Sequence, residues 1–285
     1  MEIEIVISDN CSTDNTEELC RCYTDKYENI RYFRNEGNIK DANFIKVLSL
    51  GNGEYLKLIN DWASLKPDSL SYMLEIIRNN IADKPTLFFT SGYLLTKWKD
   101  KKDPIKCANL DEYIQVVSTY VTSILIFGVW KDQLALIQDP LKYSELLLNQ
   151  VDWTFQLLTT NGCLIYNRPI IQQNNSMKSK PRGGYNWFQV HLDYYYKIMT
   201  PYINMGLVSN KTLEQDKRNL LQHFIPELGY SLLYTPHFWK FSKKDTWKIL
   251  REYYSIDPFI VKITFLVLLR NAKSIVSTII RNLIR

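Results

Sequence analysis

The stretch that decides the fold is IEIVISDNCSTDNTEEL, residues 3–19. Residues 2–7 alternate charged and apolar side chains and then run apolar, which predicts a strand that enters a core. Asp9 and Asn10 break this strand, and a polar loop follows. Residues 12–14 can cap a helix there, and the apolar spacing beyond the loop is helical. The predicted order is therefore strand, polar loop and helix.

The alternation of strands and helices continues outward from this stretch. Strands are predicted at 30–33, 54–59, 86–92 and 122–128, and helices at 42–50, 70–77 and 109–118. From about residue 140 the spacing is mainly helical. The predicted fold class is α/β, with a doubly wound, mostly parallel sheet followed by a helical C-terminal region. Ligands bind such sheets at the carboxyl ends of strands, where Asp9–Asn10 and Asn60–Asp61 both fall.

Composition excludes several classes of protein. The chain of 285 residues is 46% hydrophobic, so it can bury a full core. Its five cysteines form no CxxC pair, which fits reduced thiols in a cytoplasmic protein and argues against a zinc site. The N-terminus has neither the basic nor the apolar region of a signal peptide. We therefore expect a cytoplasmic globular protein.

The net charge of +5 is concentrated in the C-terminal stretch 258–285, where five basic residues and no acidic residue follow Pro258. A nucleic-acid binder would spread its cations over a face, so nucleic acid is not the expected partner. From Ala272 onward, apolar residues recur at helical spacing opposite basic ones. The pattern predicts a helix that lies on an anionic membrane surface, at the inner face of the cell membrane. The alternative is a helix packed on its own domain.

Three segments resemble family 2 glycosyltransferases in order and spacing: IEIVISDNCSTDNTEEL, RNEGNIKDANFIKVL (34–48) and GNGEYLKLINDWASLKPDSL (51–70). The family forms VVDDGSTDNT and EYLWLLGDDDILKPDAL are similar to the first and third. The resemblance implies a GT-A fold that binds a nucleotide sugar and builds bacterial surface polysaccharide. By the same resemblance, Asp9 and Asn10 hold the nucleotide base. The alternative for these two residues is a turn and helix cap.

Two features depart from the family pattern. The chain begins at what should be the second strand of the family, and we expect that an internal start codon or a truncated gene explains this. The Asp-Asp-Asp of the family is Asp61-Trp62-Ala63 here. Asn60 and Asp61 can still contact the donor, and Asp61 is the candidate ligand for Mg²⁺ or Mn²⁺. Since Ala63 offers no carboxylate, metal binding is in doubt.

An inverting transfer also needs a base that takes the proton of the acceptor hydroxyl. Asp152 stands near the place of the family's Glu-Asp pair, and Glu145 is the second choice. An ordinary helix carboxylate is the alternative for Asp152. The loop at 177–184 offers three cations that can offset diphosphate charge, with a solvated linker as the alternative. These cations are Lys178, Lys180 and Arg182.

The predicted organisation has three parts. These are a GT-A domain at 1–170, a helical acceptor-side region at 171–257 and the membrane-surface helix at 258–285. Aromatic residues at 185–202 can stack on an acceptor sugar, although helical spacing is more typical of a core. The predicted function is transfer of a sugar from a nucleotide-diphosphate sugar to a lipid-linked or polysaccharide acceptor in capsule, O-antigen or exopolysaccharide synthesis. The alternative is a catalytically impaired relative that binds a sugar or a partner.

Overall fold

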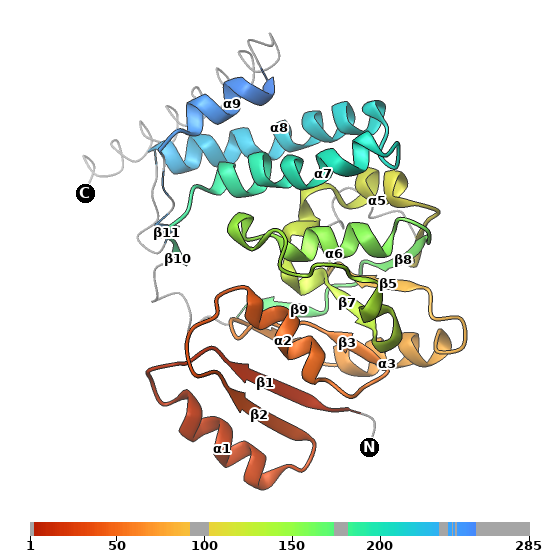
Figure 1. Cartoon of the computed structure of the whole chain (residues 1–285), viewed down its shortest axis with the longest axis vertical. Coiled ribbons are helices and arrows are strands. Elements are labelled where there is room, and N and C mark those ends of the chain that lie inside the picture. The colour runs from red at the N-terminus through yellow and green to blue at the C-terminus, as the bar shows by residue number, and fades with distance from the viewer. Residues whose placement is uncertain are drawn as a thin grey trace, which may run out of the picture. The chain divides into compact units, whose positions relative to one another are not determined.

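The structure is a computed structural model that describes residues 3–91, 103–173, 182–233, 239–240, 242 and 244–254. The chain divides into two compact units, Met1–Gln173 and Asn174–Arg285. Figure 1 labels their helices and strands. The predicted membrane-surface helix at 258–285 lies outside the described residues, as do Lys178 and Lys180.

The first unit alternates strands and helices, with short 3₁₀ turns marked η. Its elements are β1 (Ile5–Asp9), α1 (Thr16–Lys26), β2 (Ile30–Arg34), α2 (Ala42–Leu50), β3 (Tyr55–Lys57), β4 (Ala63–Leu65), α3 (Ser69–Asn79), β5 (Thr86–Phe89), β6 (Ile105–Cys107), α5 (Leu110–Val117), η1 (Ser118–Thr122), η2 (Ile124–Ile126), β7 (Gly128–Trp130), η3 (Lys131–Leu136), η4 (Ser144–Leu146), α6 (Asn149–Leu157), β8 (Cys163–Tyr166) and β9 (Ile171–Gln173). The predicted strand, polar loop and helix at the start of the chain correspond to β1, the loop after it and α1.

Strands of the first unit pair in both directions. β1 and β2 lie side by side as a parallel pair, as Figure 1 shows, and β5 pairs with β8 in parallel. The antiparallel pairs are β3 with β7, β4 with β9, and β6 with β8. The Asp9–Asn10 corner lies at the carboxyl end of a parallel strand, whereas the Asn60–Asp61 corner follows β3, whose partner β7 is antiparallel.

The prediction of a strand at 122–128 is wrong for most of this stretch. Two 3₁₀ turns, η1 and η2, occupy this stretch, and the strand β7 begins only at Gly128. Residues 124–127 are all buried. A continuous apolar run has no period, so it cannot distinguish a buried strand from buried turns.

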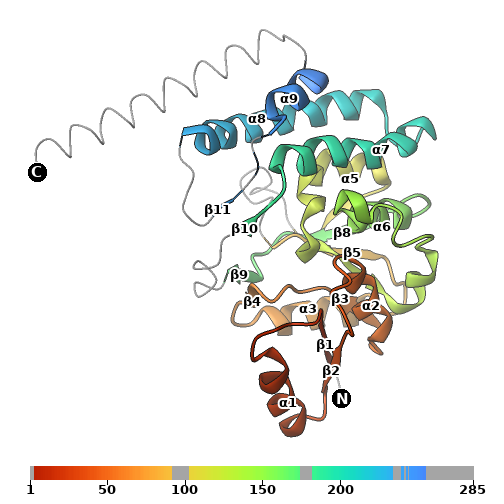
Figure 2. The ribbon, with the colours of Figure 1, turned by 60° about the vertical axis from the view of Figure 1, so that its left-hand side comes forward.

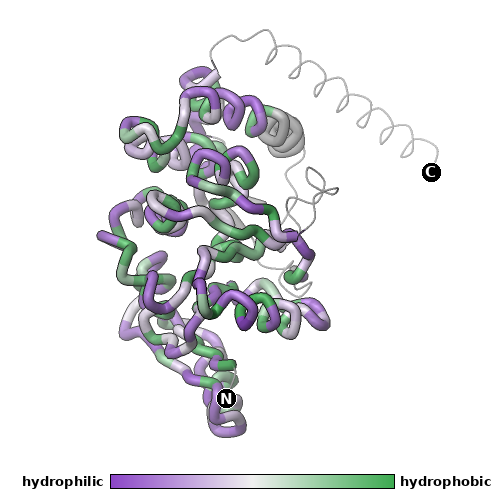
Figure 3. The backbone as a smooth tube through the Cα atoms, turned by 90° about the vertical axis from the view of Figure 1, so that its right-hand side faces the viewer, coloured by the Kyte–Doolittle hydropathy of each residue, from purple (hydrophilic) through white to green (hydrophobic). Residues whose placement is uncertain are grey.

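The core of the first unit forms around the strands that position the site. One cluster joins Leu48 of α2, Leu56 of β3 and Trp153 of α6, and a second joins α3, β5 and β8. Figure 3 shows hydrophobic and hydrophilic residues alternating along the chain, as expected for elements with one buried side. Tyr55 crosses Gly128 on the paired strand, and its hydroxyl donates to the carbonyl of Leu87 at 2.8 Å. A Cβ at position 128 would lie only 2.2 Å from the Tyr55 hydroxyl oxygen.

The described part of the second unit is mainly helical. Its elements are β10 (Arg182–Gly183), the π-helix η6 (Gln189–Tyr194), α7 (Tyr195–Asn204), α8 (Asn210–Leu233), β11 (Trp239–Lys240) and α9 (Thr246–Tyr254). α7 and α8 run side by side in Figures 1 and 2. Tyr196 donates to Asp216 across them at 3.2 Å, and Tyr253 of α9 donates to Asp193 at 2.7 Å. Among the residues that the structure describes, no helix is sufficiently long and apolar to cross a membrane.

Candidate functional site

Asp9 is the last residue of β1, and its carboxylate is almost completely enclosed. The backbone amide of Ser12 donates to Oδ1 at 2.9 Å, and the Tyr32 hydroxyl donates to Oδ2 at 2.7 Å. The guanidinium of Arg34 lies 3.5 Å from Oδ2, and the Asp9 side chain is 1% exposed. Burial alone would raise the pKa of Asp9, but these hydrogen bonds and the charge of Arg34 hold it below its ordinary value. Asp9 is thus an ionised, firmly held carboxylate.

Asn10 ties the end of β1 to the turn that precedes α2. Its Oδ1 accepts from the Ile39 amide at 2.8 Å and from Asn35 at 3.2 Å. Its Nδ2 donates to Asn38 Oδ1 at 3.0 Å and to the Lys40 carbonyl at 3.2 Å. Every polar atom of the side chain is therefore engaged within the protein. These partners lie 25–30 residues away in the sequence, so the Asn10 side chain forms neither the local turn nor the helix cap that was the alternative to base recognition.

The second predicted corner, Asn60–Asp61, has the opposite character. It forms a turn between β3 and β4, closed by the Ala63 amide, which donates to the Asn60 carbonyl at 3.1 Å. Trp62 packs against the core cluster around β3, and Ala63 is buried as the first residue of β4. Asp61, which precedes both, is exposed. The neighbours anchor the turn while the Asp61 carboxylate stays accessible to a ligand.

Lys57, the last residue of β3, lies beside the second corner and was not singled out in the sequence analysis. Its ammonium donates to the carbonyls of Leu58 at 3.2 Å, Phe127 at 3.1 Å and Leu125. Burial lowers the pKa of Lys57 from 10.5 to about 7. The lysine joins the end of β3 to the segment that leads into β7, directly before the Asn60–Asp61 turn. A lysine within an otherwise apolar strand was the available signal.

The residues at this corner do not form a complete metal site. Asp61 offers one exposed carboxylate and Asn60 one amide oxygen, whereas Ala63 offers none. Over the described ranges, no group of three Asp, Glu, His or Cys side chains is placed to hold a metal ion. Divalent Mg²⁺ and Mn²⁺ require about six oxygen ligands. The protein alone therefore fits such an ion poorly, and no step below passes through one.

Asp152 lies in the first turn of α6 and is 2% exposed. Gln156, one helical turn later, donates to its Oδ2 at 2.7 Å. A carboxylate at this end of a helix is stabilised by the helix dipole. Glu145, the second candidate base, is an exposed residue of η4. The structure thus places Asp152 in a fixed environment and Glu145 on the surface.

A third polar group lies at the carboxyl ends of β5 and β8 and was not singled out from the sequence. Thr90 donates to Asn167 Oδ1 at 2.6 Å, and Ser91 accepts from the Ile171 amide at 2.8 Å. All three side chains are buried. The available signal was the polar pair Thr90–Ser91 directly after the apolar strand β5. These contacts fix the strand ends beside β9, which pairs with β4.

The remaining candidates lie in the second unit. Arg182 belongs to β10. Most aromatic residues of 185–202 are buried, whereas Tyr185 is 37% exposed. His191 contacts Trp187, and burial lowers the pKa of its imidazole to about 4. The aromatic stretch is therefore mainly a core, with Tyr185 at its surface.

Comparisons with known proteins agree with the fold. The glycosyl transferase family 2 profile matches residues 1–117. The abequosyltransferase RfbV of Salmonella typhimurium is 41% identical over 75 residues, which are 26% of this chain and 22% of that protein. The match thus spans about a fifth of the length of this relative.

Solved structures of S. aureus TarS share the fold at low sequence identity. The crystal structure of TarS has 16% identity and a TM-score of 0.53, covering 96% of this chain and 48% of that chain. The structure of TarS 1–349 in complex with UDP-GlcNAc has 16% identity and a TM-score of 0.51, covering 92% and 75%. Residues 1–117 thus resemble glycosyl transferase family 2, and the chain has the α/β fold of the GT-A type.

Proposed function

We propose that this chain transfers a sugar from a nucleoside-diphosphate sugar during the synthesis of a surface polysaccharide. The observation that carries the proposal is the family match over residues 1–117, which contains both polar corners at the strand ends. The names of its relatives support it: one is an abequosyltransferase, and TarS has been solved with UDP-GlcNAc. The donor class proposed here is accordingly a nucleotide sugar.

The two corners would divide the work of holding the donor. The Asp9–Asn10 corner is rigid and fully hydrogen-bonded, so it supplies shape and a fixed negative charge beside the nucleotide. The exposed Asp61 turn supplies a carboxylate that is accessible to the sugar of the donor. Arg182, with Lys178 and Lys180, would offset the charge of the departing diphosphate.

The proposed reaction is a single displacement with inversion at the sugar carbon. The acceptor hydroxyl attacks this carbon, the bond to the diphosphate breaks, and the Asp152 carboxylate takes the hydroxyl proton. Gln156 donates to one Asp152 oxygen and so orients the carboxylate. The acceptor would be lipid-linked or a growing polysaccharide, and the basic stretch 258–285 would hold the chain at the inner face of the cell membrane, where such acceptors lie.

Donor binding tests this proposal directly. Calorimetry and thermal shift with UDP-, GDP- and dTDP-sugars, each with and without Mn²⁺, should show that at least one nucleotide sugar binds and stabilises the chain. Free sugars at the same concentration are the control. If no nucleotide sugar binds under either condition, the proposal is wrong.

Asp152→Asn tests the assignment of the base. We expect turnover to fall by about 100-fold or more, with donor affinity unchanged, because the amide cannot take a proton. Glu145→Gln is the matched variant and should keep turnover. The opposite pattern would transfer the role to Glu145.

A second candidate function is supported by the incomplete metal corner. Because Ala63 replaces a carboxylate, the chain would then bind a nucleotide sugar or a partner without transferring the sugar. Donor binding without turnover, tested over a panel of lipid-linked and polysaccharide acceptors, would favour this second function. Turnover with any acceptor would exclude it.

A further inference from the structure

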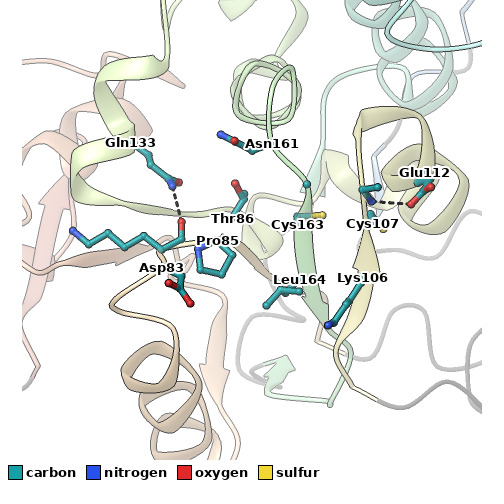
Figure 4. A pocket seen from close by; sticks show the side chains of 13 residues that line it. Asp83, Pro85, Thr86, Lys106, Cys107, Glu112, Gln133, Asn161, Cys163 and Leu164 are labelled. Atoms are coloured by element: carbon teal, nitrogen blue, oxygen red, sulfur yellow. Dashed lines mark hydrogen bonds between the residues drawn. The ribbon is translucent and has the colours of Figure 1, made fainter.

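A pocket of about 640 Å³ lies away from the corners described above. It opens at the amino ends of the parallel strands β5 and β8, where Thr86 and Cys163 are the first residues. Figure 4 shows side chains from both strands, from β6 and from η3 around it. Donor sites of α/β sheets lie at the opposite, carboxyl ends of the strands. The proposed sugar transfer therefore leaves this pocket without a role.

Two cysteines face each other in the wall of the pocket. Cys107 ends β6 and Cys163 begins β8, and the two residues are direct partners in the antiparallel register. Directly opposed residues of such a pair have Cα atoms about 4.5–5.5 Å apart and side chains on the same face. Disulfides form between Cα atoms about 4.4–6.8 Å apart. Both cysteines are free thiols, and their register places them in the range at which a disulfide can form.

The two cysteines are buried, but small molecules can reach them through the pocket. Each cysteine is 3% exposed, and both line the pocket, as Figure 4 shows. A small oxidant can thus enter where a protein reductase cannot. Gly162 lets the two strands meet this closely, because a Cβ at that position would lie 2.4 Å from the Cys107 carbonyl oxygen.

The surroundings assign different roles to the two sulfur atoms. The hydrogen bond with Cys107, followed by burial, raises the pKa of the Cys163 thiol well above its ordinary value. Cys163 therefore keeps its proton, and Cys107 is the sulfur that we assign to the first attack. The Tyr113 hydroxyl interacts electrostatically with both thiols, and in the described part of the chain its oxygen makes no hydrogen bond. A buried donor of this kind is suited to a sulfur that becomes negatively charged.

We propose that Cys107 and Cys163 are a peroxide-reactive pair that forms a reversible disulfide between β6 and β8. The Cys107 thiolate attacks hydrogen peroxide, which gives a sulfenic acid and hydroxide. Cys163 then attacks the Cys107 sulfur, and hydroxide leaves. The protons of the two thiols convert the two hydroxides to water. In total, two thiols are oxidised and one peroxide is reduced to two water molecules.

Peptide mapping of the full chain tests the proposal. After treatment with hydrogen peroxide and alkylation of the remaining thiols, mass spectrometry should find the peptides of Cys107 and Cys163 joined, lighter by two hydrogens. Dithiothreitol should restore both thiols. The oxidised chain should melt on the order of 5 °C higher, because the link constrains the unfolded chain. Links that instead involve Cys11, Cys20 or Cys22, or no link at all, would overturn the proposal.

Single variants separate the roles of the two sulfur atoms. In Cys163→Ser, the Cys107 sulfenic acid should persist and be trapped by dimedone. In Cys107→Ser, no adduct should form at Cys163. Cys22→Ser, an exposed residue of α1, is the matched control and should keep the disulfide. An adduct at Cys163 but none at Cys107 would contradict the proposed order of attack.

Tyr113→Phe tests the surroundings without removing a sulfur. The reaction with peroxide should slow several-fold, because the donor to the thiolate is lost. The melting temperature should stay or rise, since the hydroxyl that is removed makes no hydrogen bond. An unchanged rate would show that Tyr113 plays no part.

Discussion

The two strand-end corners have similar sequences and opposite physical states. Asp9–Asn10 ends β1 with an enclosed carboxylate and an amide whose every polar atom is engaged. Asn60–Asp61 follows β3 with an exposed carboxylate, next to the partly buried Trp62. In the described residues, no hydrogen bond or ion pair joins one corner to the other. An Asp-Asn pair after a strand thus indicates the edge of the sheet where a ligand binds. It does not indicate which of the two side chains is accessible to that ligand.

This difference between the corners predicts that the first contributes to the stability of the fold and the second to the recognition of a ligand. Removing a group from the first corner leaves buried partners unpaired, which costs free energy of unfolding. Removing a group from the second corner changes only what a ligand meets. Four variants or conditions test this separation, taken from the largest effect on unfolding to the smallest.

Asp9→Ala should lower the free energy of unfolding by about 3 kcal/mol. The Tyr32 hydroxyl and the Arg34 guanidinium would lose their buried acceptor. Urea unfolding followed by circular dichroism measures the change. Glu18→Ala, an exposed carboxylate of α1, is the control and should stay within about 0.5 kcal/mol. A small effect of Asp9→Ala would remove the contrast between the corners.

Lys57→Met should alter the pH dependence of stability near the second corner. The folded pKa of Lys57, about 7, lies below its ordinary 10.5, so between these values the unfolded chain holds a proton that the folded chain has released. Stability of the wild type should therefore rise with pH across this window, by an amount on the order of 1–2 kcal/mol. The melting temperature of the variant should change less between pH 6 and 10 than that of the wild type. If the two proteins show the same dependence on pH, the lowered pKa of Lys57 is contradicted.

Acid should remove the contribution that Asp9 at the first corner makes to the free energy of unfolding. The pKa of Asp9 is lowered in the folded chain, so its contribution is complete above the unfolded value and is lost as pH falls through the folded value. The stability difference between the wild type and Asp9→Asn should be constant near neutral pH and shrink below about pH 4. Thermal melts between pH 2.5 and 7 measure it. A constant difference down to the lowest pH would contradict the lowered pKa.

Asp61→Asn should change the free energy of unfolding by less than about 0.5 kcal/mol, because the side chain is exposed. Affinity for the nucleotide sugar should nevertheless fall about tenfold, the loss of one charge-assisted contact. Calorimetry with the donor measures it, and Asp25→Asn on α1 is the matched surface control. Equal affinities for both variants would take Asp61 out of the site.

Much of the fold could be predicted from periodicity. The helix at Ala42–Leu50 ends at the predicted glycine, and the strand Ile30–Arg34 lies where alternation placed it. The stretch 122–128 could not be predicted, because four consecutive buried apolar residues carry no period. The local pattern of apolar residues indicates which face of an element is buried. Where all faces are buried, the pattern no longer distinguishes a strand from a helix or a turn.

The site was less predictable because its state depends on distant partners. Asp9 and Asn10 were found from the motif, yet their enclosure depends on Tyr32, Arg34 and the turn before α2. No motif marks those residues as partners. The dithiol pair depends on the register of β6 against β8, and fifty-odd residues of sequence separate its members without a CxxC signature. Pairings between strands far apart in the chain are what a single sequence does not specify.

Because Tyr55 lies across Gly128, substitutions at positions 55 and 128 depend on each other. With hydrogen as the only side chain that fits at position 128, any larger residue there requires a smaller residue than tyrosine at position 55. Gly128→Ala alone and Tyr55→Leu alone should each impair folding, whereas the double variant should recover part of the loss. Among relatives, the two positions should therefore vary as a pair, and an ancestral change at one would have opened the way for the other.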